Sequence, residues 1–237
     1  TLSLHDALPI LCNSYHMRIT KIVDLSHPVD ANTQVYPGDP EVRFEPHSTV
    51  ARDGFNLLTV HMGSQSGTHV DAPYHFDDDT ERIDQVPLGH FIGRGIIVDL
   101  RGIAPRSPIT WTLIESQVSH AGAGDIVIFH TGFSRLWQSK AYFDNPFLTE
   151  DACQHLLDQG VRTFGVDFLN IDETPDDDHP GGDFDSHHLI AKAGGIICEN
   201  LTNLDAVDFA EPLISILPIK FTGADGAPVR AVALQLG

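Results

Sequence analysis

Short apolar runs recur along the chain between clusters of Gly, Pro, Asn and Asp, and each run predicts a strand. The runs at residues 95–100 and 125–130 are mostly apolar, as in strands that are buried on both faces. Residues 56–62 alternate well enough to predict a strand that leads toward residue 69. The other expected strands are residues 21–25, 161–166, 196–199, 213–220 and 229–236.

Three segments have the features of helices, at residues 112–122, 149–159 and 186–193. Each begins with a Ser or Thr that can cap the first turn, and each ends at or just before a glycine. In the first segment, Glu115 follows Thr112 at the spacing of a capping box. Because strands outnumber helices and partly alternate with them, the sequence predicts a single mixed α/β domain with a central β core.

The composition of the chain says more about which partners it can bind than about its fold. Hydrophobic residues make up 41% of the 237 residues, a typical globular value, and no apolar run is long enough to cross a membrane. The 14 Lys and Arg against 33 Asp and Glu give a net charge of −19, which argues against nucleic acid or an anionic membrane as partner. The 3 scattered cysteines predict no disulfide framework, so a reducing cytoplasm is the expected location.

The start of the chain has a different character from the rest. Residues 1–10 resemble the conceptual translation of a DNA-sequencing adapter, and they lack the basic start and cleavage site of a signal peptide. We therefore expect residues 1–16 to be a non-native leader, and residues 17–237 to form the native domain.

The strongest chemical pattern is the stretch from Gln65 to Phe76, which contains His69, Asp71 and His75. Strand side chains alternate between faces, so these three side chains can project to one side of a strand and its end. Imidazole and carboxylate are both ligands of divalent metals, and a further imidazole beside them can act as a base. The stretch therefore predicts a metal site that activates water.

A second candidate segment, residues 185–201, contains another His and Glu that the fold could bring together. His187 lies near the start of an expected helix and Glu199 near the end of the expected strand that follows. A helix–turn–strand unit can bring these two ends to one edge of a sheet. The adjacent His188 is open to two interpretations, a partner of a ligand or an ordinary helix residue.

The first pattern resembles the signature H-x-G-T-H-x-D-x-P-x-H of the metal-dependent cyclase family, which includes bacterial kynurenine formamidases and isatin hydrolases. Every fixed position matches except the first, where Gln65 stands in place of His. The second segment resembles the family's His-His pair and its Glu before Asn-Leu. Six shorter blocks also resemble sequences of the family and occur in the family's order, although each alone is a weaker signal. They are residues 24–29, 36–39, 131–133, 165–167, 217–220 and 223–226.

The resemblance implies a swivelling β/β/α-like fold, a homodimer or homotetramer, and one or two Mn or Zn ions per subunit. It implies that His75 is the catalytic residue, and that His27 and Tyr36 line the substrate pocket. The metal ligands it implies are His69, Asp71, His187 and Glu199, together with Gln65 at the position where the signature has His.

Gln65 leaves two interpretations open. An amide oxygen is a harder and weaker ligand than imidazole, which favours a single site or manganese over zinc. Alternatively, Gln65 does not bind metal and orients water.

The expected function is hydrolysis of an amide by a metal-bound hydroxide, with His75 moving the proton to the leaving group. The resemblance makes an N-formyl aryl amide such as N-formylkynurenine, a compound of tryptophan catabolism, the leading small-molecule substrate. An isatin-like lactam or lactone, or a non-catalytic metal-binding role, is the alternative. A serine hydrolase is disfavoured, because residues 63–67 carry Gln65 where the nucleophile elbow needs Ser.

Overall fold

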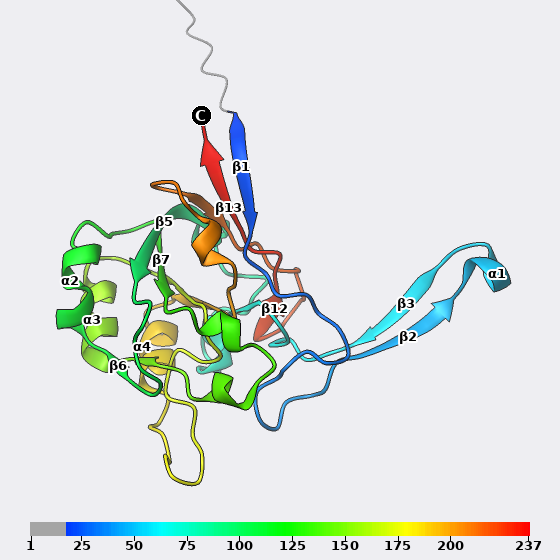
Figure 1. Ribbon diagram of the computed structural model, residues 1–237, viewed down its shortest axis with the longest axis horizontal. Coiled ribbons are helices and arrows are strands. Elements are labelled where there is room, and N and C mark those ends of the chain that lie inside the picture. Colours follow the sequence, from blue (N-terminus) through cyan, green and yellow to red (C-terminus); the bar gives the residue numbers. More distant parts are fainter. Residues whose placement is uncertain (1–17) are drawn as a thin grey trace, which may run out of the picture.

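The computed structural model describes residues 18–237, so the expected leader at residues 1–16 lies outside the described part (Figure 1). A mixed sheet of nine strands forms its centre, in the order β1-β13-β11-β5-β7-β9-β10-β4-β12. In that order the strands are β1 (Ile19–Asp24), β13 (Val232–Leu236), β11 (Leu213–Ser215), β5 (Ile92–Asp99), β7 (Asp125–His130), β9 (Thr163–Val166), β10 (Ile196–Glu199), β4 (His69–Asp71) and β12 (Gly226–Pro228). Strands β5, β7, β9 and β10 run parallel, and antiparallel strands extend the sheet on both sides.

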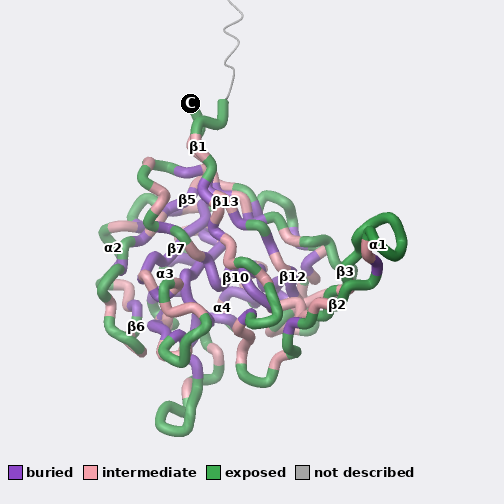
Figure 2. The backbone as a smooth tube through the Cα atoms, turned by 45° about the vertical axis from the view of Figure 1, so that its right-hand side comes forward, coloured by how far each residue is buried: buried purple, intermediate pink, exposed green. Residues whose placement is uncertain are grey.

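Three α-helices pack together beside the parallel strands (Figure 1): α2 (Trp111–Val118), α3 (Glu150–Asp158) and α4 (Asp185–Lys192). Strand β7 shows why its sequence is apolar throughout. Val127 and Phe129 belong to the core under these helices, whereas Ile126 and Ile128 belong to a second core on the other face. The predicted α/β domain with a central β core is therefore confirmed, and Figure 2 shows the buried backbone concentrated in these strands.

A two-stranded hairpin projects from this body (Figure 1). It consists of β2 (Arg43–Ser48) and β3 (Leu57–His61), with the short helix α1 (Val50–Asp53) at its tip. Strand β2 was not expected, because it contains a proline and few apolar residues. The remaining elements are short: β6 (Pro108–Ile109), β8 (Phe147–Leu148), η1 (Pro73–His75), η2 (Leu88–His90), η3 (Phe133–Leu136), η4 (Lys140–Phe143) and η5 (Leu204–Ala206).

Several element ends differ from those expected. The strand predicted at residues 213–220 ends at Ser215, and the one predicted at 229–236 begins at Val232. Helix α2 begins at Trp111, one residue before the expected cap, and ends at Val118, so the predicted capping box does not form. Within the described part of the chain, no helix is long and apolar enough to cross a membrane.

The start of helix α4 corrects a further expectation. Ser186 was expected to cap this helix, but it lies inside the first turn, and its Oγ donates a hydrogen bond to the carbonyl of Leu148 at 3.0 Å. The backbone amides of Ser186 and His187 donate instead to the carboxylate of Asp172, at 2.9 and 3.1 Å. A distant carboxylate thus supplies the cap that the local sequence predicted for Ser186. The expected cap of α3 is confirmed, because the Thr149 side chain accepts from the amide of Ala152.

Candidate metal centre

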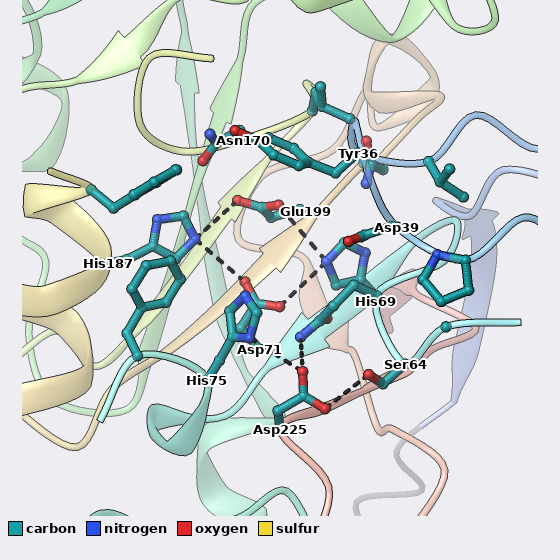
Figure 3. Close-up of a pocket in the computed structure, with 18 of the residues that line it drawn as sticks. Tyr36, Asp39, Ser64, His69, Asp71, His75, Asn170, His187, Glu199 and Asp225 are labelled. Carbon is teal, nitrogen blue, oxygen red and sulfur yellow. Dashed lines mark hydrogen bonds and ion pairs between the residues drawn. The ribbon is translucent and has the colours of Figure 1, made fainter. Parts of the chain in front are cut away.

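The register of two neighbouring strands brings together residues that lie far apart in the sequence. Strands β4 and β10 are antiparallel, with Glu199 opposite His69 and Ile197 opposite Asp71. His69 and Asp71 are two residues apart on β4 and therefore share a face with Glu199. Helix α4 places His187 over the same face, and all four polar side chains are buried (Figure 3).

In this cluster each carboxylate lies between two imidazoles. His69 Nε2 is 3.3 Å from Asp71 Oδ1 and 3.7 Å from Glu199 Oε2. His187 Nε2 is 3.7 Å from Asp71 Oδ2 and 3.6 Å from Glu199 Oε1. An ion at ordinary zinc–ligand distances spaces its tetrahedral donors by roughly 3.4 Å, so these separations fit a metal centre.

The surroundings of the cluster also fit a cation. Asp71 Oδ1 is buried and, apart from its ion pair with His69, has no hydrogen-bond donor among the described residues. Next to the cluster opens a cavity of about 340 Å³, and no Lys or Arg is among the described residues that line it. Two buried carboxylates without a fixed cation are costly, and a divalent ion removes that cost.

Hydrogen bonds orient both imidazoles of the cluster. His69 Nδ1 lies 2.8 Å from the carbonyl of Gly67, and His187 Nδ1 lies 2.6 Å from Asp172 Oδ2. Both partners are acceptors, so each ring donates from Nδ1 and turns Nε2 toward the carboxylates, where Nε2 can bind a metal once it has lost its own proton. The backbone amide of Ile171 also donates to Glu199 Oε1 at 2.9 Å, which holds that carboxylate in place.

The pKa values of the cluster show how closely its charges are linked. Burial raises the pKa of Glu199 to about 7, and the charge of Asp71 adds to the shift. Burial also opposes ionisation of Asp71, but the neighbouring imidazoles hold its pKa well below the usual range. For the imidazoles burial lowers the pKa, and the carboxylates more than offset this, to about 9 for His69 and about 10 for His187. A metal that binds here displaces these protons.

His75 lies beside the cluster without belonging to it. It ends the short helix η1, and its side chain is 31% exposed at the cavity. Its Nδ1 is 3.2 Å from Asp225 Oδ2, and its ring centre is 6.2 Å from that of His187. Gln65 also lines the cavity, and its Nε2 donates to the same Asp225 oxygen at 2.9 Å.

The structure thus brings His69, Asp71, His187 and Glu199 together and turns Gln65 toward Asp225. Sequence reasoning missed Asp172, which orients His187 and caps its helix. One clue was available: Asp172 follows β9, and the carboxyl ends of parallel strands meet at one edge of a sheet. The structure also shows where three other residues named from the sequence lie. Tyr36 lines the cavity, while His27 stacks on Trp137 and is not among the lining residues. His188 is exposed, and its ring meets Phe76 edge-on.

Replacing Asp172 with Asn is expected to lower metal affinity about 10- to 100-fold, because a neutral amide accepts the Nδ1 proton of His187 more weakly than a carboxylate, and its NH₂ group would face a backbone amide that now donates to Asp172. Competition against a chromophoric chelator measures this affinity. Asp208→Asn, which changes an exposed carboxylate paired with Lys21, is the control and should leave the affinity unchanged. Equal affinity in both variants would show that Asp172 does not tune the site.

The fold and this cluster define a class of α/β protein in which His and carboxylate side chains gather on neighbouring strands of a mixed sheet and on an adjacent helix. A family described as Putative cyclase matches residues 23–173. The chain belongs to this family, as its motifs predicted.

Comparisons with individual proteins agree with this assignment. A kynurenine formamidase from Bacillus cytotoxicus is 29% identical over 230 residues, which cover 93% of this chain and 100% of the relative. The structure of an isatin hydrolase bound to the product analogue thioisatinate matches with a TM-score of 0.81 at 23% identity, covering 92% of this chain and 93% of that chain. A potential metal-dependent hydrolase with cyclase activity matches with a TM-score of 0.70 at 28% identity, covering 90% of this chain and 97% of that chain. The isatin hydrolase likeness confirms the fold class.

Proposed function

We propose that this chain is a metal-dependent hydrolase of a C–N bond other than a peptide bond, with an N-formyl aryl amide of the N-formylkynurenine type as substrate. The observation that carries the proposal is the buried cluster of His69, Asp71, His187 and Glu199 at a cavity that also exposes His75. The relatives named kynurenine formamidase and the neighbours named isatin hydrolase support this class of reaction.

The four clustered side chains are the proposed ligands of one or two divalent ions, Mn or Zn. Their donors are nitrogen and oxygen only, a set that suits both metals. When bound, such an ion supplies a Lewis acid that polarises a carbonyl and activates water at neutral pH. Asp71 and Glu199 each lie between the two imidazoles, so each would offer an oxygen to either side of the cluster if two ions bind.

The residues around the cluster suit the remaining tasks. Among the described residues, His75 is the one imidazole on the cavity wall outside the cluster, and this position supports the proposal that it holds a proton for the leaving nitrogen. Apolar side chains on the wall can hold an aryl ring and exclude water from it. These are Val35, Tyr36, Phe76, Leu169 and Phe184.

We further propose a homodimer or homotetramer in the cytoplasm. The projecting hairpin supports assembly, because a two-stranded hairpin is marginally stable alone and this one exposes Phe55, Leu57, Leu58 and Val60 by 47–55%.

Hydrolysis of N-formylkynurenine tests the proposed reaction. Purified protein is assayed as isolated, after removal of metal with a chelator, and after addition of Mn or Zn. We expect turnover to disappear with the chelator and to return with one of the metals, because the proposed reaction needs a bound ion to activate water. Turnover that survives complete metal removal would contradict the mechanism. Metal-dependent turnover of a cyclic lactam or lactone, without turnover of the formamide, would replace the proposed substrate with the alternative.

A further inference from the structure

Asp225 is the centre of a hydrogen-bond network on the cavity wall, next to the metal centre. Its Oδ2 contacts His75 Nδ1 at 3.2 Å and accepts from Gln65 Nε2 at 2.9 Å. Its other oxygen, Oδ1, accepts from the hydroxyl of Ser64 at 2.8 Å. Figure 3 shows Asp225 between Ser64 and His75, below the ligand cluster. Three side chains from two separate segments thus converge on one carboxylate.

The backbone fixes Asp225 relative to both His75 and the metal ligands. Ala72, which lies three residues before His75, donates its backbone amide to the carbonyl of Asp225 at 2.8 Å. The next residue, Gly226, pairs with Asp71 in the ladder between β12 and β4. The ligand Asp71, the base His75 and the carboxylate Asp225 therefore share one rigid unit of the sheet.

The packing of Gln65 is equally specific. A Cβ atom at position 226 would lie 2.7 Å from both polar atoms of the Gln65 amide. Because Gly226 has no side chain, the Gln65 amide can lie against β12, and from there it reaches Asp225. A carboxylate only accepts hydrogen bonds, so the amide must present its nitrogen to Asp225.

Charge in the network agrees with the geometry. The hydrogen bond from His75 is the largest of the causes that hold the pKa of Asp225 at about 2, so this carboxylate is ionised. An ionised carboxylate at Nδ1 fixes the imidazole as the tautomer that carries its proton there. The Nε2 atom of His75 is then the one that holds or transfers a proton during the reaction.

We propose that Asp225 is the positioning residue for His75, and that Gln65 holds this carboxylate in place rather than ligating the metal. The inference rests on the proposed role of His75. It explains the departure of Gln65 from the family signature, because this position serves the base through Asp225 instead of completing a metal site.

The variant Asp225→Asn tests the first half of the proposal. Its amide can donate to Nδ1, so the tautomer with the proton on Nε2 becomes the favoured one. In the zinc-loaded protein, long-range ¹H–¹⁵N NMR should show His75 protonated on Nδ1 in the parent and on Nε2 in the variant. We expect kcat for N-formylkynurenine to fall about 100-fold while KM and metal content stay unchanged.

Asp84→Asn is the matched control for Asp225→Asn. Asp84 accepts a hydrogen bond from the backbone of Gly223, so this variant loosens the same loop outside the cavity. It should keep the parent tautomer and kcat. A His75 that stays protonated on Nδ1 in Asp225→Asn would overturn the proposal, as would an equal loss of kcat in the control. The NMR result is independent of substrate, so it stands even if the proposed reaction is wrong.

The variant Gln65→Ala tests the second half. If Gln65 serves Asp225, the metal content and the metal affinity of this variant should equal those of the parent, while kcat falls about 10-fold. Gln65→Glu, which places a second carboxylate against Asp225, should lower kcat further without loss of metal. Loss of bound metal in Gln65→Ala, measured by elemental analysis, would overturn this half and make Gln65 a ligand.

Discussion

Replacing Asp71 with Ala is expected to abolish metal binding and turnover together. Asp71 lies between both imidazoles, so its removal takes away a donor on each side of the cluster. Loss of a hydrogen-bond partner of a metal ligand typically costs about 10- to 100-fold in affinity, so loss of a ligand itself should lower metal affinity by more than about 100-fold. Elemental analysis of the purified variant and a competition titration measure this loss.

The control for this prediction is Asp208→Ala, which removes an exposed carboxylate on the surface. That variant should keep parental metal content and activity. A fully metal-loaded Asp71→Ala protein would show that the other three clustered side chains suffice, and it would remove Asp71 from the proposed ligands.

Replacing His75 with Ala is expected to separate metal binding from turnover. His75 lies at the cavity and bonds to Asp225 rather than to the clustered ligands, so its loss should leave metal content unchanged. The proton for the leaving group then has no imidazole to carry it, and general acid–base catalysis typically contributes about 10²- to 10⁴-fold. We therefore expect kcat to fall within that range. Steady-state kinetics on the metal-loaded variant give the result.

His155→Ala is a suitable control, because this imidazole is half exposed on helix α3 and stacks on Trp111 away from the cavity. It should retain parental kcat. Unchanged turnover in His75→Ala would exclude this residue as the proton carrier and would also remove the basis for the role of Asp225.

Much of the fold could be predicted because local pattern and tertiary role agree there. The apolar run of β7 is buried on both faces, and Thr149 caps α3 through its own side chain. Prediction failed where a distant group decided the local structure. Helix α4 begins one residue earlier than expected because Asp172 supplies its cap from another segment. Strand β2 forms because it pairs with β3, although its own sequence has little strand character.

The candidate site divides in the same way. The spacing of His69 and Asp71 on one strand places both on one face, so that part of the cluster could be predicted from period two alone. The approach of Glu199 and His187 depends on the pairing of β10 with β4 and on the position of α4. Their assignment from sequence therefore rested on family resemblance rather than on spacing.

The sequence by itself determined the types of the candidate ligands, the strand that presents the first two of them, and an acidic α/β domain around them. Only the tertiary structure decided which carboxylate partners which side chain: Asp172 pairs with His187, and Asp225 pairs with His75 and with the amide of Gln65. The physical reason is that a hydrogen bond depends on the position of two groups within a fraction of an ångström. Groups that are distant along the chain reach such positions only when the sheet register and the helix docking are complete.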